Sequence, residues 1–263
     1  MHPVLVEIGR FKLYSYGLML ALSFWVGILW AAHRGSKKGV KAETIYDLSI
    51  ILIVAAVLGS RVLYILTHRS DYHSLLDVVA LWQGGATFYG GFILALAGAF
   101  IFLRRKRIPF LLVADICSPS IALGYAFTRI GCFLSGCCFG LPAGSGLGIV
   151  FPAHSPAGFT CPGVPLQPTQ LYASAAGIAI AGFLVLIERR SRFRGFLFAL
   201  LCICLGVERF IEDIFRYYEP SARIGAHVTQ SQAISAAIAA VGVVLLAVLS
   251  ARAKRASGPS SVS

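Results

Sequence analysis

Seven long apolar segments, separated by short polar ones, dominate this sequence and restrict what it can fold into. A helix needs about 20 consecutive apolar residues to cross a bilayer, and each segment is near that length. Only 13% of the residues are charged and the mean hydropathy is +0.79, whereas soluble domains carry about 25% charged residues. The sequence therefore predicts an all-α membrane protein with seven transmembrane helices. The segments are 13–32, 48–66, 86–103, 111–131, 168–187, 195–207 (extending to about 212) and 230–249.

The placement of the positive charges predicts the orientation of these helices. The formal net charge is +12, and most lysines and arginines lie in the segments 33–47, 104–107, 188–194 and 252–255. The positive-inside rule makes this face cytoplasmic, which puts the N-terminus outside and the C-terminus inside. The basic charge thus reflects topology and contact with anionic lipid. We expect no nucleic-acid partner.

Nothing in the sequence indicates a separate soluble domain or an internal repeat. The first apolar segment is too long for the hydrophobic region of a signal peptide, and we interpret it as a true first helix. Residues 1–251 are predicted to form a single polytopic membrane domain. Residues 252–263 are predicted to be a basic, disordered cytoplasmic tail.

Several charged residues fall inside the apolar segments or at their outer ends. Arg61 lies within the second segment and Arg129 ends the fourth. Charges at such depth need a partner or water, although an arginine can also extend to the interface. Arg209, Asp213 and Arg216 have the spacing i, i+4 and i+7, which places them on one helical face. This face is either a self-paired surface or part of an anion site, for which guanidiniums are well suited.

The stretch "GGATFYGG" (84–91) opens the third segment on the predicted outer side. Its paired glycines allow a lipid headgroup to approach the backbone closely, but glycines also serve helix packing in membranes. Tyr16 begins the first segment, where an aromatic residue of the membrane interface is equally expected.

The chain contains seven cysteines. Cys117, Cys202 and Cys204 fall within apolar segments, where small buried thiols are common. The other four, at positions 132, 137, 138 and 161, lie on the outer face, where disulfides can form. We expect one bridge between Cys161 and either Cys137 or Cys138. Four thiols could instead hold zinc, but the spacing C-x4-C-C-x22-C does not match two CxxC knuckles, and no metal site is predicted.

Six motifs occur in an order and membrane placement that resemble the bacterial prolipoprotein diacylglyceryl transferase family. They are "YGLM", "GSRVLY", "GGATFYGG", "DICSPSIALGYAFTRIGCFLSGCCFG", "QPTQLY" and "ERFIEDIFR". The resemblance covers nearly the whole chain. It implies an enzyme of the bacterial inner membrane, without a cofactor, whose active site faces the outer side. Such an enzyme moves the diacylglyceryl group of phosphatidylglycerol onto the lipobox cysteine of a preprolipoprotein signal peptide, forming a thioether and releasing glycerol phosphate.

The resemblance also assigns roles to individual residues. Arg129 matches the arginine of the family signature, Arg209 a second essential arginine, and Tyr16 the tyrosine of the first-span motif. The two arginines would hold the lipid phosphate and stabilise the departing oxygen. The catalytic candidates are Arg129, Arg209, Tyr89 and Tyr16. The candidates for substrate binding are Arg61, Gly90, Gly91, Gly131, Ser135, Gly140, Asp213 and Arg216.

The chain departs from the family pattern at several polar positions. Tyr89 stands where the family usually has a histidine, and Cys132, Ser135 and Cys137 replace two asparagines and a glutamate. Tyr89 could act as the base only if arginines lowered its phenol pKa from about 10. Three alternatives therefore remain: a paralogue with the same phospholipid site and another acceptor, a membrane thiol redox protein using Cys137, Cys138 and Cys161, and a non-catalytic lipid-binding protein.

Overall fold

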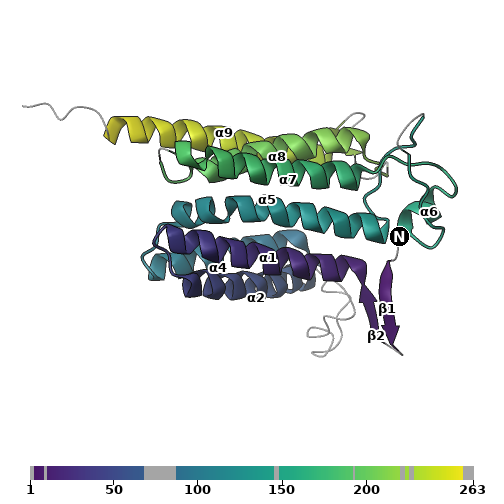
Figure 1. Cartoon of the computed structure of the whole chain (residues 1–263), viewed down its shortest axis with the longest axis horizontal. Helices are drawn as coiled ribbons and strands as arrows, with labels where there is room; N and C mark the ends of the chain where they lie inside the picture. Colours follow the sequence, from purple (N-terminus) through teal and green to yellow (C-terminus); the bar gives the residue numbers. More distant parts are fainter. Residues whose placement is uncertain are drawn as a thin grey trace, which may run out of the picture. The chain divides into compact units, whose positions relative to one another are not determined.

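A computed structural model describes residues 3–8, 11–67, 87–144, 148–191, 193–219, 223–224 and 228–256. A long helix occupies each of the seven predicted apolar segments, which confirms the predominantly helical architecture (Figure 1). These helices are α1 (Ser15–Lys37), α2 (Ala42–Thr67), α4 (Phe88–Arg105), α5 (Phe110–Ser135), α7 (Thr169–Ile187), α8 (Phe196–Phe215) and α9 (Gln230–Ala256).

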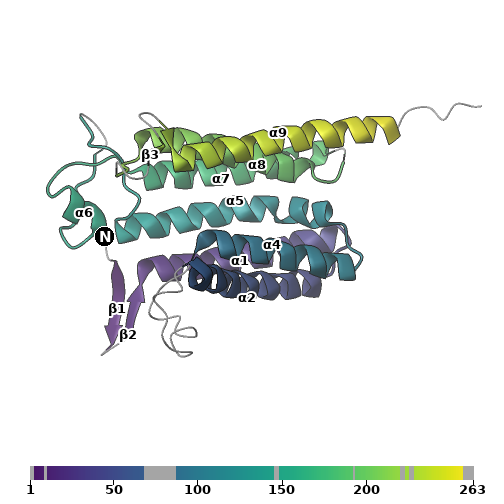
Figure 2. The ribbon, with the colours of Figure 1, turned by 180° about the vertical axis from the view of Figure 1, so that it is seen from behind.

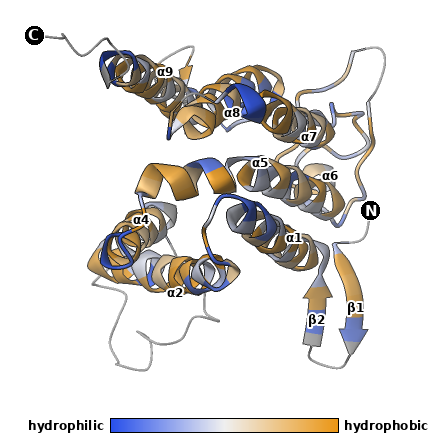
Figure 3. Ribbon diagram, turned by 60° about the vertical axis from the view of Figure 1, so that its left-hand side comes forward, coloured by the Kyte–Doolittle hydropathy of each residue, from blue (hydrophilic) through white to orange (hydrophobic). Residues whose placement is uncertain are grey.

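Five of the helices in the described part of the chain are long and apolar enough to cross a membrane, namely α1, α2, α5, α7 with its following turn, and α9. Figure 3 shows hydrophobic residues along most of their length. Helix α4 ends in two arginines, and the second half of α8 carries four charged residues. The chain is therefore a membrane protein with several apolar helices. The count of seven crossings and the orientation of the termini stay predictions.

Short elements accompany the long helices. Strands β1 (Val4–Ile8) and β2 (Phe11–Tyr14) form an antiparallel hairpin before α1, and β3 (Arg223–Ile224) pairs with β4 (Val228–Thr229). Hydropathy indicated none of these strands. Two further short elements are α6 (Pro156–Thr160) and the 3-10 helix η3 (Glu188–Arg190). Helix α9 continues through Ala256, which makes the first part of the predicted tail helical, and residues 257–263 lie outside the described residues.

The chain divides into two compact units, residues 31–113 and residues 1–30 with 114–263. In the first of these, α2 and α4 lie side by side (Figures 1 and 2). A Cβ atom at Gly90 would lie 2.2 Å from the carbonyl oxygen of Gly59, and one at Gly59 would lie 2.3 Å from that of Gly90. Only glycine at both positions permits this backbone approach. Whether the chain functions as the single domain predicted for 1–251 stays a prediction.

In the other unit, α8 packs against both α7 and α9 (Figures 1 and 2). Asp115 near the start of α5 accepts hydrogen bonds from the backbone N–H groups of Gly195 (2.7 Å) and Phe198 (2.9 Å), which cap the first turn of α8. This contact brings the beginnings of the two helices together. About four turns further along α5 lies Arg129, which contacts the end of α8.

Candidate active site

A single carboxylate joins the two arginines that the sequence selected. Nη2 of Arg129, on α5, donates to Oε2 of Glu212, on α8, at 2.9 Å, and Nη1 of Arg209 donates to the same oxygen. Only 9% of the Arg129 side chain and 3% of the Glu212 side chain are exposed. The structure therefore holds Arg129 and Arg209 together on a buried anion.

A second carboxylate fixes the other side of Arg209. Nη2 of Arg209 lies 3.1 Å from Oδ1 of Asp213, and Tyr218 donates to that oxygen at 2.6 Å. Arg209 also donates to the Tyr218 hydroxyl at 2.9 Å. Burial and the hydrogen bond to Asp213 raise the pKa of Tyr218. Tyr218 therefore stays protonated at neutral pH and serves as a donor.

Arg216 does not continue the predicted helical stripe. Helix α8 ends at Phe215, and Arg216 has an extended backbone with φ −87° and ψ 142°. Its guanidinium carbon lies 5.0 Å from the centre of the Tyr218 ring. The helix ends here because Arg216 pairs with Gly140, while Leu141 N–H donates to the Phe215 carbonyl at 2.8 Å.

Three buried polar atoms in this network have no hydrogen-bond partner within the described ranges. They are Oε1 of Glu212, Oδ2 of Asp213 and Nε of Arg216. Buried polar atoms are nearly always paired in folded proteins. Two acceptors and one donor are therefore available here for a ligand or for water.

Tyr125 supports the network from α5. The guanidinium carbon of Arg129 lies 4.8 Å from the centre of the Tyr125 ring, and the Tyr125 hydroxyl donates to Oε2 of Glu208 at 2.8 Å. The cation over the ring and the hydroxyl–carboxylate bond restrict where the Arg129 side chain can lie.

An apolar groove of about 590 Å³ runs between α7 and α8, with Glu212 among its lining residues. Its walls are mainly aliphatic, and the carboxyls are confined to one helix. The groove thus offers space for hydrocarbon beside the buried arginine network. Its lining residues are Thr169, Tyr172, Ala173, Ala176, Ala179, Ile180, Ile203, Cys204, Val207, Glu208, Ile211, Glu212 and Phe215.

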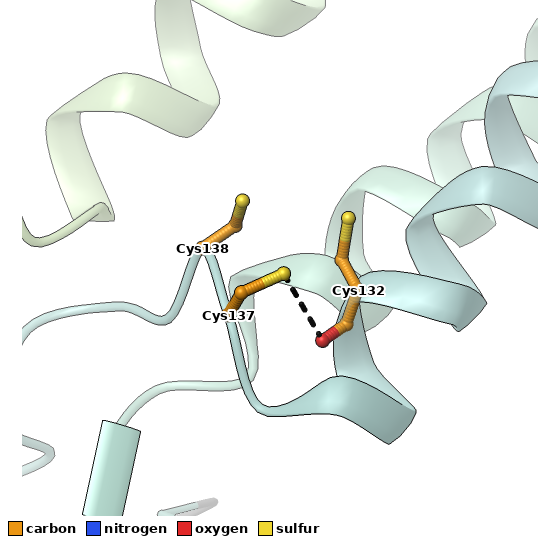
Figure 4. Close-up of side chains that lie close together, drawn as sticks. All are labelled: Cys132, Cys137 and Cys138. Carbon is orange, nitrogen blue, oxygen red and sulfur yellow. Dashed lines mark hydrogen bonds between the residues drawn. The ribbon is translucent and has the colours of Figure 1, made fainter. Parts of the chain in front are cut away.

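Three thiols gather at the end of α5. The Sγ atoms of Cys132, Cys137 and Cys138 lie within 4.8 Å of one another (Figure 4). The backbone at the end of α5 brings the thiols together, because Gly136 adopts a left-handed conformation with φ +70°. The N–H of Gly136 donates to the Phe133 carbonyl at 3.1 Å, and the N–H of Cys137 donates to the Cys132 carbonyl at 3.1 Å. This pair of bonds is the Schellman ending of a helix, which brings the side chains at both ends of the turn together.

The loop after this turn is tied to α7 and to the end of α8. Gln170 donates to the Cys137 carbonyl at 2.7 Å, and Thr169 donates to the Cys138 carbonyl at 3.1 Å. Cys138 adopts φ +60°, a left-handed conformation that is rare for residues other than glycine. The "QPTQLY" motif thereby holds the thiol cluster in place.

The neighbouring thiols and arginines shift the pKa values of Cys137 and Cys138 in opposite directions. Bonds from Cys132 and Cys137, together with the charges of Arg216 and Arg129, lower the pKa of Cys138 against the effect of burial. Interactions with Cys132 and Cys138, together with burial, raise the pKa of the Cys137 thiol. Of these two loop thiols, Cys138 is therefore the one that ionises more readily.

The predicted disulfide is not formed in the structure. All seven cysteines are free thiols, and each lies within the described residues. Cys161 packs against a separate buried cluster that includes Phe139, Phe151 and Leu166. Its side chain is thus engaged in hydrophobic packing, while Cys137 and Cys138 belong to the thiol cluster.

Other selected residues line the same part of the molecule. Tyr16, 39% exposed, lies within electrostatic reach of Arg129 and of all three clustered thiols. Gly131 allows α1 to approach, since a Cβ atom there would lie 3.0 Å from Cβ of Met19. Gly140 is similarly confined by Gln167, and Ser135 is the last residue of α5.

The remaining candidates belong to the unit of residues 31–113. Arg61 is buried on α2, Tyr89 is exposed on α4, and Gly90 and Gly91 pack against α2. Packing between α4 and α2 thus explains Gly90 and Gly91, which agrees with the helix-packing interpretation of these glycines from the sequence. A contact of these four residues with substrate stays a prediction, and 84–86 of the "GGATFYGG" stretch lie outside the described residues.

Sequence reasoning missed Glu212, Tyr125 and Tyr218, and it named Cys132 among the outer thiols without assigning it to a site. Glu212 stands three residues after Arg209, a spacing at which helical side chains meet, and this signal was available. Its bond to Arg129 joins residues 83 apart in the sequence. Such a contact can be found only in the folded chain.

Buried guanidiniums beside an apolar groove, in a chain of long apolar helices, define a membrane protein suited to an anionic amphipathic ligand. The family model described as "Prolipoprotein diacylglyceryl transferase" matches residues 3–248. The chain belongs to this family, whose members are membrane enzymes.

Curated relatives support the assignment over most of the chain. A "Phosphatidylglycerol--prolipoprotein diacylglyceryl transferase" of Clostridium tetani is 32% identical, covering 82% of this chain and 86% of the relative. The protein with the same name and the number 2 in Clostridium perfringens is 30% identical, with 98% and 99% covered. One from Geobacter sulfurreducens is 32% identical, with 85% and 84% covered.

Proposed function

We propose that this protein transfers the diacylglyceryl group of phosphatidylglycerol to the lipobox cysteine of a prolipoprotein. The names of its relatives describe this donor and this acceptor. The observation that carries the proposal is the placement of Arg129 and Arg209 on one buried carboxylate, which also lines the apolar groove between α7 and α8.

The two arginines bind the phosphate of the lipid. A guanidinium has five N–H donors, and the bond to Glu212 uses one donor of Arg129. Glu212 acts as a positioning residue that keeps both guanidiniums at one place and limits their mutual repulsion. Because charge builds up on the phosphate oxygen as it departs, these donors stabilise the transition state more than the bound lipid.

The remaining parts of phosphatidylglycerol find matching surfaces. The acyl chains lie along the aliphatic walls of the groove. The hydroxyl groups of the glycerol headgroup donate to Oε1 of Glu212 and Oδ2 of Asp213, which have no other partner among the described residues. A choline headgroup has no hydroxyl to donate. The two carboxylate oxygens, which need hydrogen-bond donors, therefore favour a lipid with a glycerol headgroup over one with a choline headgroup.

The reaction is an alkyl transfer to sulfur. The acceptor thiolate attacks the glyceryl carbon next to the phosphate, the carbon–oxygen bond breaks, and its electron pair leaves with glycerol phosphate. The thiol must lose its proton first, because the thiolate is the nucleophile. Tyr89 is the candidate base that the resemblance offers, and Tyr16 lies near the arginine and the thiols.

The same proposal includes the membrane arrangement. All seven long helices cross the bacterial inner membrane, the N-terminus is outside and the C-terminus is cytoplasmic. The distribution of lysines and arginines supports this orientation. The end of α5 and the loop of thiols then face the outer side, where the prolipoprotein cysteine emerges.

The test uses purified full-length protein in lipid nanodiscs with a lipobox peptide and a reductant. We expect a diacylglyceryl mass gain on the peptide when phosphatidylglycerol is present, and none when phosphatidylcholine replaces it. Arg129→Ala should abolish the gain, while Arg189→Ala, an exposed arginine in η3, should leave it intact. A peptide that stays unmodified by the unaltered protein, while the protein still binds phosphatidylglycerol, would overturn the proposal.

A further inference from the structure

The clustered thiols of Cys132, Cys137 and Cys138 have the dimensions of a metal-binding site. Their sulfur atoms lie within 4.8 Å of one another. Zinc binds thiolate at about 2.3 Å, and a tetrahedron of that size separates its sulfurs by about 3.8 Å. Rotamer adjustments of about 1 Å or less would therefore bring all three sulfurs onto one ion.

The backbone already holds these side chains in position. The Schellman turn around Gly136 places Cys132 beside Cys137. Thr169 donates a hydrogen bond to the Cys138 carbonyl, and Gln170 donates one to the Cys137 carbonyl. Cys138 is additionally held in a left-handed conformation. Such strain at a residue other than glycine is typical of functional sites.

The group offers three protein ligands. Among the described residues, no histidine, aspartate, glutamate or fourth cysteine joins it. Structural zinc sites in proteins are closed by four protein ligands, whereas catalytic zinc sites have three and keep the fourth position open. Cys132 is buried, but Cys137 and Cys138 are partly exposed. A ligand arriving from outside can therefore reach the fourth position.

We propose that Cys132, Cys137 and Cys138 bind a zinc ion whose fourth position takes the acceptor thiol. The inference rests on the proposed function, which makes that acceptor a cysteine. It replaces the expectation from sequence that the chain has no metal site. Three thiolates and one Zn²⁺ carry a net charge of −1, and the nearby positive charges of Arg129 and Arg216 compensate it.

The step balances without a redox partner. The acceptor R–SH binds zinc as R–S⁻ and releases its proton to water, because a thiol that coordinates zinc is deprotonated. The sulfur then attacks the glyceryl carbon, a carbon–sulfur bond forms, and the carbon–oxygen bond breaks with its electron pair on the phosphate. The neutral thioether is a weaker zinc ligand than a thiolate, and the product dissociates.

The first test measures metal content. Purified full-length protein is loaded with ZnSO₄ under reductant, freed of excess ion and analysed for zinc by mass spectrometry. We expect one zinc per chain in the unaltered protein and in the control Cys161→Ser, which removes an outer thiol beyond the cluster. Cys132→Ser and Cys137→Ser should lose the ion. Cys138→His should retain it, because imidazole is also a zinc ligand, and this variant excludes misfolding as the cause.

The second test asks whether the acceptor enters the fourth position. In Co²⁺-loaded protein, a lipobox peptide should change the visible d–d absorption, whereas the same peptide with serine in place of its cysteine should not. A chelator should lower kcat/KM at pH 7 by about tenfold or more, since only a few per cent of an uncoordinated cysteine is thiolate at that pH. Stoichiometric Zn²⁺ should restore it.

The outcomes separate this inference from the proposed function. Transfer that survives chelation and both serine substitutions would overturn the zinc site and leave the transferase intact. One tightly held zinc with an unchanged Co²⁺ spectrum on adding peptide would overturn the role of the acceptor. Zinc binding with a peptide-dependent spectrum, but no transfer from phosphatidylglycerol, would support the site and contradict the proposed reaction. Less than 0.1 zinc per chain, on the order of adventitious binding, would refute the site itself.

Discussion

The substitution Glu212→Gln tests whether one carboxylate positions both arginines. It removes a negative charge but preserves the size of the side chain, and no cavity results. Glu212 accepts from Arg129 at 2.9 Å and from Arg209, and 3% of its side chain is exposed. We expect a loss of stability, because Arg129 is then buried without its ionic partner.

The expected size follows from the burial of the pair. Removing one partner of a buried ion pair costs about 3–5 kcal/mol. The lower end applies here, because the amide oxygen of glutamine still accepts one hydrogen bond and Arg209 keeps Asp213 at 3.1 Å. A loss of about 3 kcal/mol, at about 2 °C for each kcal/mol, lowers the melting temperature by about 6 °C. The control Glu219→Gln removes an exposed carboxylate and should change it by less than about 1 °C.

Lipid provides the second half of this test. The phosphate of phosphatidylglycerol supplies an anion to the same guanidiniums and should recover part of the loss. Thermal unfolding is followed in detergent micelles with increasing phosphatidylglycerol or a phosphate-free glycolipid. We expect phosphatidylglycerol to raise the melting temperature of Glu212→Gln more than that of the unaltered protein. Equal melting temperatures, or equal lipid shifts in both proteins, would refute the shared-carboxylate reasoning.

Three further substitutions test other parts of the structure. Arg129→Lys removes the planar fork of guanidinium donors, and kcat/KM in the peptide assay should therefore fall by about 10²- to 10³-fold. A decrease smaller than tenfold would contradict the role of Arg129 in binding the lipid phosphate. Gly90→Ala places a Cβ atom 2.2 Å from the Gly59 carbonyl oxygen. It should lower the free energy of unfolding, measured by thermal unfolding, by about 1–3 kcal/mol. The control Gly182→Ala, with no atom within 4 Å of the added Cβ, should not destabilise the protein. Tyr89→Phe should retain turnover in zinc-loaded protein, because the bound metal then deprotonates the acceptor thiol. A loss of turnover of about 10²- to 10⁴-fold would instead identify the Tyr89 phenol as the base.

Hydropathy predicted the helices because a helix that crosses a bilayer needs a long, nearly continuous apolar stretch. It located all seven segments, yet it ended the sixth at about residue 207 to 212, whereas α8 continues to Phe215. The i, i+4 spacing of Arg209 and Asp213 left a self-paired surface as one of two interpretations, and the structure shows this ion pair. Arg216 lies beyond the helix because its backbone pairs with Gly140. That contact joins residues distant in sequence, and no helical spacing reveals it.

The thiol cluster shows what spacing rules can miss. The spacing of the cysteines in "CFLSGCC" does not match paired CxxC knuckles. The informative residue is Gly136, which ends α5 in a left-handed turn. A cysteine four residues before such a glycine and another directly after it occupy the two positions that a Schellman turn brings together. Knowledge of where the helix ends would therefore have predicted the contact between Cys132 and Cys137.

The anion site and the thiol cluster depend on the same two helix ends. Arg129 and Cys132 are three residues apart on α5 and share one of its faces, while the loop that carries Cys138 pairs with the chain directly after α8. Helix α8 supplies Glu212 about one turn and Arg209 about two turns before that pairing. A nucleophile held by the thiols and a phosphate held by the arginines would thus be positioned by one rigid arrangement. Because alkyl transfer requires the attacking sulfur and the departing oxygen on opposite sides of one carbon, a common support for both groups is the feature that the reaction needs most.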